Sequence, residues 1–150
     1  MPAPKSILAE MRRPFAPVDK TKVLYKKTLD ACLKMPKRYT YLVLQDVIHL
    51  AGLVMDNAKA ANSIRPKNQH EAQLRRDYWL HARANLQALS SRIDRFLEIP
   101  ETLRYKDEIS GRAKGITVSE LCEIADLVNE EMGLLTSTLE NELQRYKNLP

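Results

Sequence analysis

Apolar residues recur every three or four positions along two long stretches of this sequence, 38–62 and 68–98. This spacing places the apolar side chains on one face of an α-helix. The two stripes are Leu44, Val47, Ile48, Ala51, Val54, Met55 and Ala58, and then Trp79, Ala82, Leu86, Leu89, Ile93 and Phe96. Pro36 and Pro66 lack a backbone donor and disfavour helix in the preceding residue, so they mark helix boundaries. The pattern predicts an antiparallel helical hairpin whose apolar face needs two further helices.

The rest of the chain supplies a helix on either side of this hairpin. We expect Asp19 to cap a first helix over 20–34. Thr117 and Glu120 have the spacing of a capping box at the start of a last helix over 117–147. That helix carries apolar residues in the rhythm of bundle packing, at Val118, Leu121, Ala125, Val128, Met132, Leu135 and Leu139.

The predicted fold is therefore an all-α, up-down-up-down four-helix bundle over residues 19–150. Residues 1–18 contain four prolines and little periodicity, which predicts an extended, mobile arm. The segment 101–115 is expected to be an irregular connection. No apolar run is long enough to span a membrane, and Cys32 and Cys122 stand alone, which suggests two buried, reduced thiols in a cytoplasmic protein.

Charge is distributed unevenly along the chain. Residues 1–38 hold ten Lys or Arg against three Asp or Glu, whereas residues 115–150 hold two against seven. A basic region of this kind is compatible with binding to a polyanion. We expect Glu130 and Glu131 to lie on the acidic surface of the last helix, away from such a partner.

No set of residues has the pattern of an active site. Asp77 and His81 are four apart, and Asp46 and His49 are three apart, but two residues do not make a metal centre. The sequence has no glycine-rich phosphate loop and no nucleophile motif. We therefore expect a non-enzyme with no catalytic residue, no bound metal and no cofactor. A metal-dependent enzyme using Asp77 and His81 is the last alternative.

Clustered basic residues form the candidate binding surface. Guanidinium and ammonium groups match phosphate oxygens, and neutralising each phosphate releases counterions. The candidate nucleic-acid-binding residues are Lys26, Lys27, Lys37, Arg38, Arg75, Arg76 and Arg83. The neighbouring aromatic residues Tyr39, Tyr41, Tyr78 and Trp79 are candidates for stacking on unpaired bases, although aromatic residues at helical spacing are more often core. A solvated basic face that only confers solubility is the alternative.

Several segments resemble a known family. They are the turn Met35-Pro36-Lys37-Arg38, the stretch Leu50–Ala61, the pair Leu86 and Leu89, and the stretch Ile124–Leu139 around Met132-Gly133-Leu134-Leu135. In these segments the chain resembles the accessory variability determinant (Avd) proteins of diversity-generating retroelements. It is also similar to the wider group of four-helix-bundle proteins encoded within bacterial ribosomal-RNA intervening sequences.

This resemblance implies a homopentamer of four-helix protomers with a basic surface. Such a protein binds the element's reverse transcriptase and its template RNA, with cDNA as a further possible ligand, and supports error-prone cDNA synthesis without performing chemistry. Two alternatives stay open: an RNA- or ribosome-associated bundle, and a purely structural oligomeric adaptor. Four leucines off the main stripes suggest a second apolar surface for self-association, namely Leu42, Leu53, Leu127 and Leu134.

Overall fold

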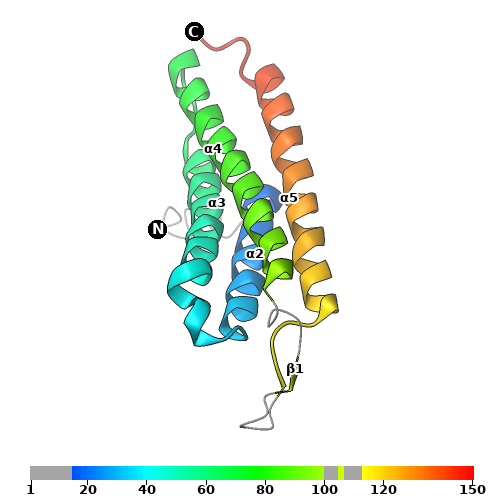
Figure 1. Ribbon diagram of the computed structural model, residues 1–150. Helices are drawn as coiled ribbons and strands as arrows, with labels where there is room; N and C mark the ends of the chain where they lie inside the picture. Colours follow the sequence, from blue (N-terminus) through cyan, green and yellow to red (C-terminus); the bar gives the residue numbers. More distant parts are fainter. Residues whose placement is uncertain (1–14, 100–104, 107–112) are drawn as a thin grey trace, which may run out of the picture.

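The computed structural model describes residues 15–99, 105–106 and 113–150. Four helices run in alternating directions: α2 (Ala16–Leu33), α3 (Gln45–Ser63), α4 (Gln69–Asp94) and α5 (Val118–Arg145) (Figure 1). Each helix packs against the next one in the chain, and α2 packs against α5, which closes the bundle. The predicted all-α, up-down-up-down four-helix bundle is confirmed.

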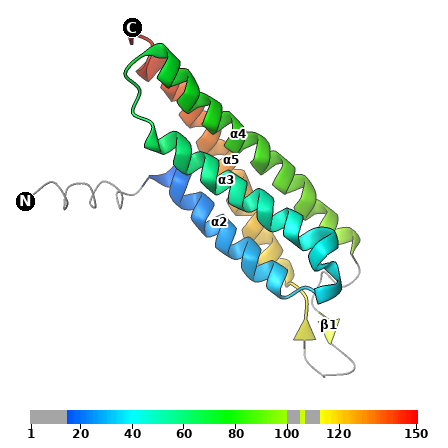
Figure 2. The same ribbon diagram turned by 90° about the vertical axis from the view of Figure 1, so that its left-hand side faces the viewer.

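The apolar stripes predicted from the sequence supply most of the core, but Val118 and Ala125 of the predicted α5 stripe are exposed. Val47, Val54, Trp79, Leu86 and Leu135 are fully or almost fully buried. Their three- and four-residue spacing places them on the inward faces of their helices, so one continuous core forms along the bundle. α4 and α5 are longer than the other two helices and extend beyond α2 at the end where the chain terminates (Figure 2).

The first helix starts earlier than the sequence suggested. α2 begins at Ala16, directly after Phe15, and a proline occupies its first turn. Proline is favoured there because the missing donor would have no partner within the helix. Asp19 is not the N-cap: its carboxylate lies in the first turn and accepts a hydrogen bond from the Phe15 backbone N–H at 2.8 Å. Of the expected arm, residues 1–14 lie outside the described residues, and residues 16–18 belong to α2.

The second helix begins irregularly. A 3₁₀ turn (Lys37–Tyr39) and a π-helical turn (Thr40–Leu44) lead into α3. Helical turns therefore begin directly after Pro36, one residue before the predicted start at residue 38. Along these irregular turns Lys37, Arg38, Tyr41 and Leu42 are exposed.

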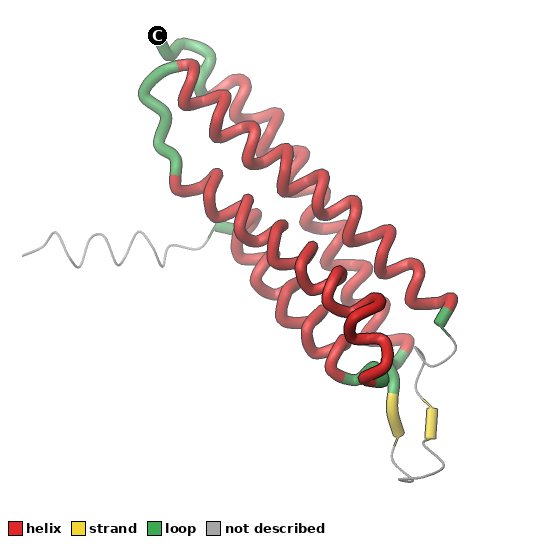
Figure 3. Tube along the Cα trace, turned by 60° about the vertical axis from the view of Figure 1, so that its left-hand side comes forward, coloured by secondary structure: helices red, strands yellow, loops and turns green. Residues whose placement is uncertain are grey.

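The starts of α4 and α5 carry side-chain caps. Asn68 accepts a hydrogen bond from the Glu71 N–H at 2.8 Å, and Thr117 accepts one from the Glu120 N–H at 3.1 Å. The Thr117 cap was predicted from the sequence. At the far end of the bundle, the C-terminal residues lie beside the α3–α4 connection (Figure 3), where the Gln69 N–H donates to the carbonyl of Pro150 at 2.8 Å.

The connection between α4 and α5 contains a small β-ribbon. α4 continues into a 3₁₀ turn (Arg95–Glu98), and β1 (Tyr105–Lys106) then pairs antiparallel with β2 (Ala113–Lys114). Gly115 follows with φ of 92°, a conformation that favours glycine, and its N–H donates to the carbonyl of Lys34 at 3.1 Å. This bond ties the connection to the end of α2.

The two cysteines occupy different environments. Cys32 is buried on α2, and burial raises the pKa of its thiol to about 12. Cys122 is exposed on α5, so the prediction of two buried thiols is wrong for this residue. It occupies a position of α5 that faces solvent rather than the core. Within the described ranges, no helix has the length and apolar character needed to cross a membrane.

Candidate nucleic-acid interface

The basic first helix and the acidic last helix lie side by side. Three lysines at seven-residue intervals, two on α2 and one at its C-cap, each form an ion pair with a glutamate of α5. The pairs are Lys20–Glu130 at 2.5 Å, Lys27–Glu123 at 2.8 Å and Lys34–Glu120 at 2.5 Å. The hydrogen bond that Lys27 donates to Glu123 raises the pKa of Lys27, and the one that Lys34 donates to Glu120 lowers the pKa of Glu120. Much of the predicted charge asymmetry is therefore neutralised within the protein, and the candidate residue Lys27 already has an anionic partner.

Arg75 does not belong to the surface. Only 5% of this residue is exposed. Its Nε donates to Glu142 Oε1 at 2.5 Å, and its Nη1 donates to the carbonyls of Ala61 and Ile64 at 2.9 and 2.8 Å. The indole of Trp79 donates to the same Glu142 oxygen at 2.9 Å. The placement of Arg75 on an exposed basic face is therefore wrong, because α4 turns this side chain inward to join α3 and α5.

Arg76 and Arg83 are both half-buried on α4. They are seven residues apart on one continuous helix, so they share a face. Arg76 donates to Gln73 Oε1 at 3.1 Å, while its Nε has no hydrogen-bond partner and is shielded from solvent. Among the described residues neither arginine has an ion-pair partner, so both guanidinium groups retain donors for an anionic ligand.

The turn between α2 and α3 combines cations with exposed aromatic surface. Lys37 and Arg38 are exposed, and the Arg38 guanidinium lies over the Tyr39 ring at 5.1 Å from its centroid. Tyr41 is 84% exposed. An exposed ring beside cations is the combination that holds an unpaired base and its phosphate. Of the other aromatic candidates, Tyr78 is half-buried and packs against the core, and Trp79 is completely buried.

The structure brings some of the candidate residues together and separates others. Lys37 and Arg38 are adjacent on the turn, and Lys26 is exposed farther along α2. Arg76 and Arg83 lie on α4, which occupies the corner of the bundle opposite α2 (Figure 1). A nucleic acid that reaches both groups must therefore pass around the bundle rather than along one flat face.

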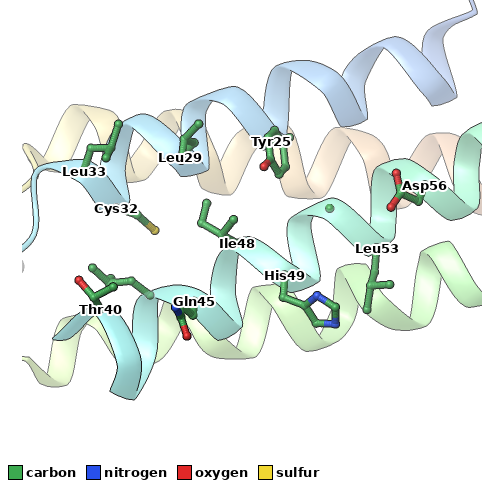
Figure 4. A pocket seen from close by; sticks show the side chains of 12 residues that line it. Tyr25, Leu29, Cys32, Leu33, Thr40, Gln45, Ile48, His49, Leu53 and Asp56 are labelled. Atoms are coloured by element: carbon green, nitrogen blue, oxygen red, sulfur yellow. The ribbon is translucent and has the colours of Figure 1, made fainter.

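An open apolar groove of about 610 Å³ lies between α2 and α3 (Figure 4). Cys32 and Ile48 point into it from opposite sides, and His49 and Asp56 lie on its α3 side. It was not predicted, because the sequence does not specify how two neighbouring stripes meet. Two leucines at the turn end of the bundle are strongly exposed: Leu33, which lines the groove, at 74% and Leu42, on the turn into α3, at 79%.

Glu131 is also placed differently from the prediction. Glu130 is exposed and binds Lys20, but Glu131 is completely buried, and neither of its carboxyl oxygens has a hydrogen-bond partner. Because burial disfavours the charged form, it raises the pKa of Glu131 to about 8. The sequence did contain the signal, since Glu131 is three residues after Val128 and four before Leu135, on the apolar stripe of α5.

The two polar pairs on helices have ordinary roles. Asp77 accepts a hydrogen bond from Gln73 Nε2 at 2.9 Å, and His81 is exposed one turn farther along. Asp46 pairs with Arg92 at 2.7 Å, which links α3 to α4. Over the part of the chain that the structure describes, no three His, Cys, Asp or Glu residues are grouped as metal ligands.

No protein-family model, no curated protein and no solved structure matches this chain.

Proposed function

We propose that this protein is a non-catalytic accessory protein that binds a reverse transcriptase and its template RNA and supports error-prone cDNA synthesis in a diversity-generating retroelement. Two kinds of observation support the proposal. The four-helix bundle is the fold that the resemblance to Avd proteins implies. The exposed turn between α2 and α3 offers the chemistry that single-stranded RNA requires. Such a protein would act in the cytoplasm.

The observation that carries the RNA-binding part is the 84% exposure of Tyr41 beside Lys37 and Arg38. A ring exposed to this extent is not needed by the core, so its apolar face is available to a base. Stacking on an aromatic residue contributes about 1–3 kcal/mol per base, and neighbouring cations bind the backbone phosphates. We therefore place the primary RNA contact at this turn and a second phosphate contact at Arg76 and Arg83.

Self-association is the second part of the proposal. The resemblance implies a homopentamer, and the exposed side chains of Leu33 and Leu42 beside the groove supply apolar surface for contact between copies. Of the four leucines selected from the sequence, Leu42 is the one exposed in this way, whereas Leu53 and Leu127 pack against the core. A ring would repeat each RNA contact and increase avidity.

RNA binding is tested by fluorescence anisotropy with a labelled single-stranded RNA of about 20 nucleotides, measured at several salt concentrations. Tyr41→Ser should weaken binding by roughly 5- to 100-fold, because one stacking contact is lost. Lys37→Glu and the double variant Arg76→Glu/Arg83→Glu should weaken binding and lower its salt dependence, because phosphate contacts are lost.

Lys147→Glu is the matched control, since this exposed lysine lies at the far end of the bundle, beyond the last helix. It should change the affinity only slightly. An affinity that is unchanged in the Tyr41 and Lys37 variants, or reduced equally by Lys147→Glu, would instead favour the adaptor function. The gene's neighbourhood separates the retroelement from other RNA-binding functions: a reverse transcriptase gene beside a template repeat supports the former.

A further inference from the structure

Glu131 is a completely buried carboxyl group inside the bundle, and both of its oxygens lack a hydrogen-bond partner. It lies on the inward stripe of α5, between the buried residues Val128 and Leu135. An apolar residue at this position would fill the same space without the cost of removing a polar group from water. The packing of the core around this position therefore depends on whether the carboxyl group is protonated, which would not be the case for an apolar residue.

The surroundings of Glu131 offer little compensation for a negative charge. From α2, the cation that acts on it is Lys20, whose amine is already bound to Glu130. The buried hydroxyl groups of Thr21 and Thr28 donate to backbone carbonyls of their own helix, so they are not directed at α5.

The other two helices contribute no free charge to the core. The buried residues of α3 are all apolar. The buried residues of α4 are apolar except Arg75, which is bound to Glu142 about three turns beyond Glu131 on α5. The charged group that could stabilise an ionised Glu131 is therefore Lys20 of α2.

We propose that Glu131 couples the packing of α2 against α5 to proton binding. Its carboxyl group holds a proton when the interface between the two helices is closed and releases it when the interface opens. α2 is the element that moves. It is the shortest of the four helices, and the side chains of its three ion pairs with α5 are 32–52% exposed, so these pairs contribute little to holding the two helices together. α4, by contrast, is joined to α5 through the buried Arg75–Glu142 pair.

The direction of the effect follows from proton linkage. In the closed state the pKa of Glu131 is raised from 4.5 to about 8, and in the open state water restores the ordinary value. Between these two values the closed state binds the additional proton, so raising the pH favours opening by about tenfold per pH unit. Below and above this window both states bind the same number of protons, and the opening equilibrium no longer depends on this group.

Hydrogen exchange followed by mass spectrometry measures the opening of each helix. Full-length wild type, Glu131→Gln and Glu130→Gln are compared between pH 5.5 and 9, with rates corrected for intrinsic exchange. The opening constant of α2 amides in the wild type, divided by that in Glu131→Gln, should rise about tenfold per pH unit and level off near pH 8. Glu130→Gln, the exposed neighbour, should retain the slope of the wild type.

A ratio that does not change with pH would overturn the proposal. So would an equal slope for amides of α2, α3 and α4, because the whole bundle would then be unfolding. If Glu131→Gln does not fold, carboxyl NMR of the wild type provides the second measurement. A Glu131 resonance that titrates near pH 8, together with α2 exchange that accelerates over the same range, supports the coupling. A resonance that titrates near 4.5 refutes it.

Discussion

The buried ion pair between Arg75 and Glu142 allows a sharp test of how the far end of the bundle is held together. Both side chains are about 95% buried, and Glu142 Oε1 accepts hydrogen bonds from Arg75 and from Trp79. Glu142→Gln keeps an oxygen acceptor at this position but removes the negative charge. The guanidinium group of Arg75 would then be a buried charge without a counterion.

The expected loss is large for a chain of this size. Breaking a buried ion pair from one side costs about 3–5 kcal/mol, because the remaining charge is not compensated. Since 1 kcal/mol shifts the melting temperature by roughly 2–4 °C in domains of 150 residues or more, Glu142→Gln should melt about 6–20 °C below the wild type. The double variant Arg75→Met/Glu142→Gln has no buried charge, so it should be more stable than Glu142→Gln alone. Its residual loss comes from the carbonyls of Ala61 and Ile64, which no longer receive the Arg75 donor.

Urea unfolding followed by circular dichroism gives the free energies for the wild type, both single variants and the double variant. The coupling energy between positions 75 and 142 should be at least about 2 kcal/mol, with the double variant losing less than the sum of the single losses. Losses that add within about 0.5 kcal/mol would refute the reasoning, since they would show that the two charges do not depend on each other.

Two further predictions concern association and thiol chemistry. Light scattering at micromolar concentration should give a mass several times that of one 17.2 kDa chain. Leu42→Ser should lower this mass, whereas Leu143→Ser, which changes an exposed leucine on α5, should not. A wild-type mass of one chain would contradict the proposed self-association. Cys122 should react quickly with a thiol reagent and Cys32 slowly, because burial raises the pKa of Cys32 to about 12 and blocks access. Cys122→Ser should remove the fast phase alone. Two thiols that react equally fast in the folded protein would contradict this prediction.

The sequence by itself determined the helices and their pairing. Apolar residues at helical spacing, prolines at positions 36 and 66, and the capping residue Thr117 act locally, through backbone geometry and hydrogen bonds within a few residues. The short connection between α3 and α4 then leaves few ways to bury the stripes, so the up-down-up-down bundle could be predicted. Local signals were also the reason for the error at Asp19, where a carboxylate suited to a cap lies instead in the first turn.

Only the tertiary structure decided what each charged residue does. Lys27 and Arg75 look alike in the sequence, but one pairs with Glu123 at the surface and the other is enclosed with Glu142. Glu130 and Glu131 are neighbours in the chain, and one is exposed while the other is buried. A charge takes its role from the partners and the water around it, and these come from helices that lie far away in the sequence. For this physical reason the bundle could be predicted from the sequence, whereas the residues that make up its basic surface could not.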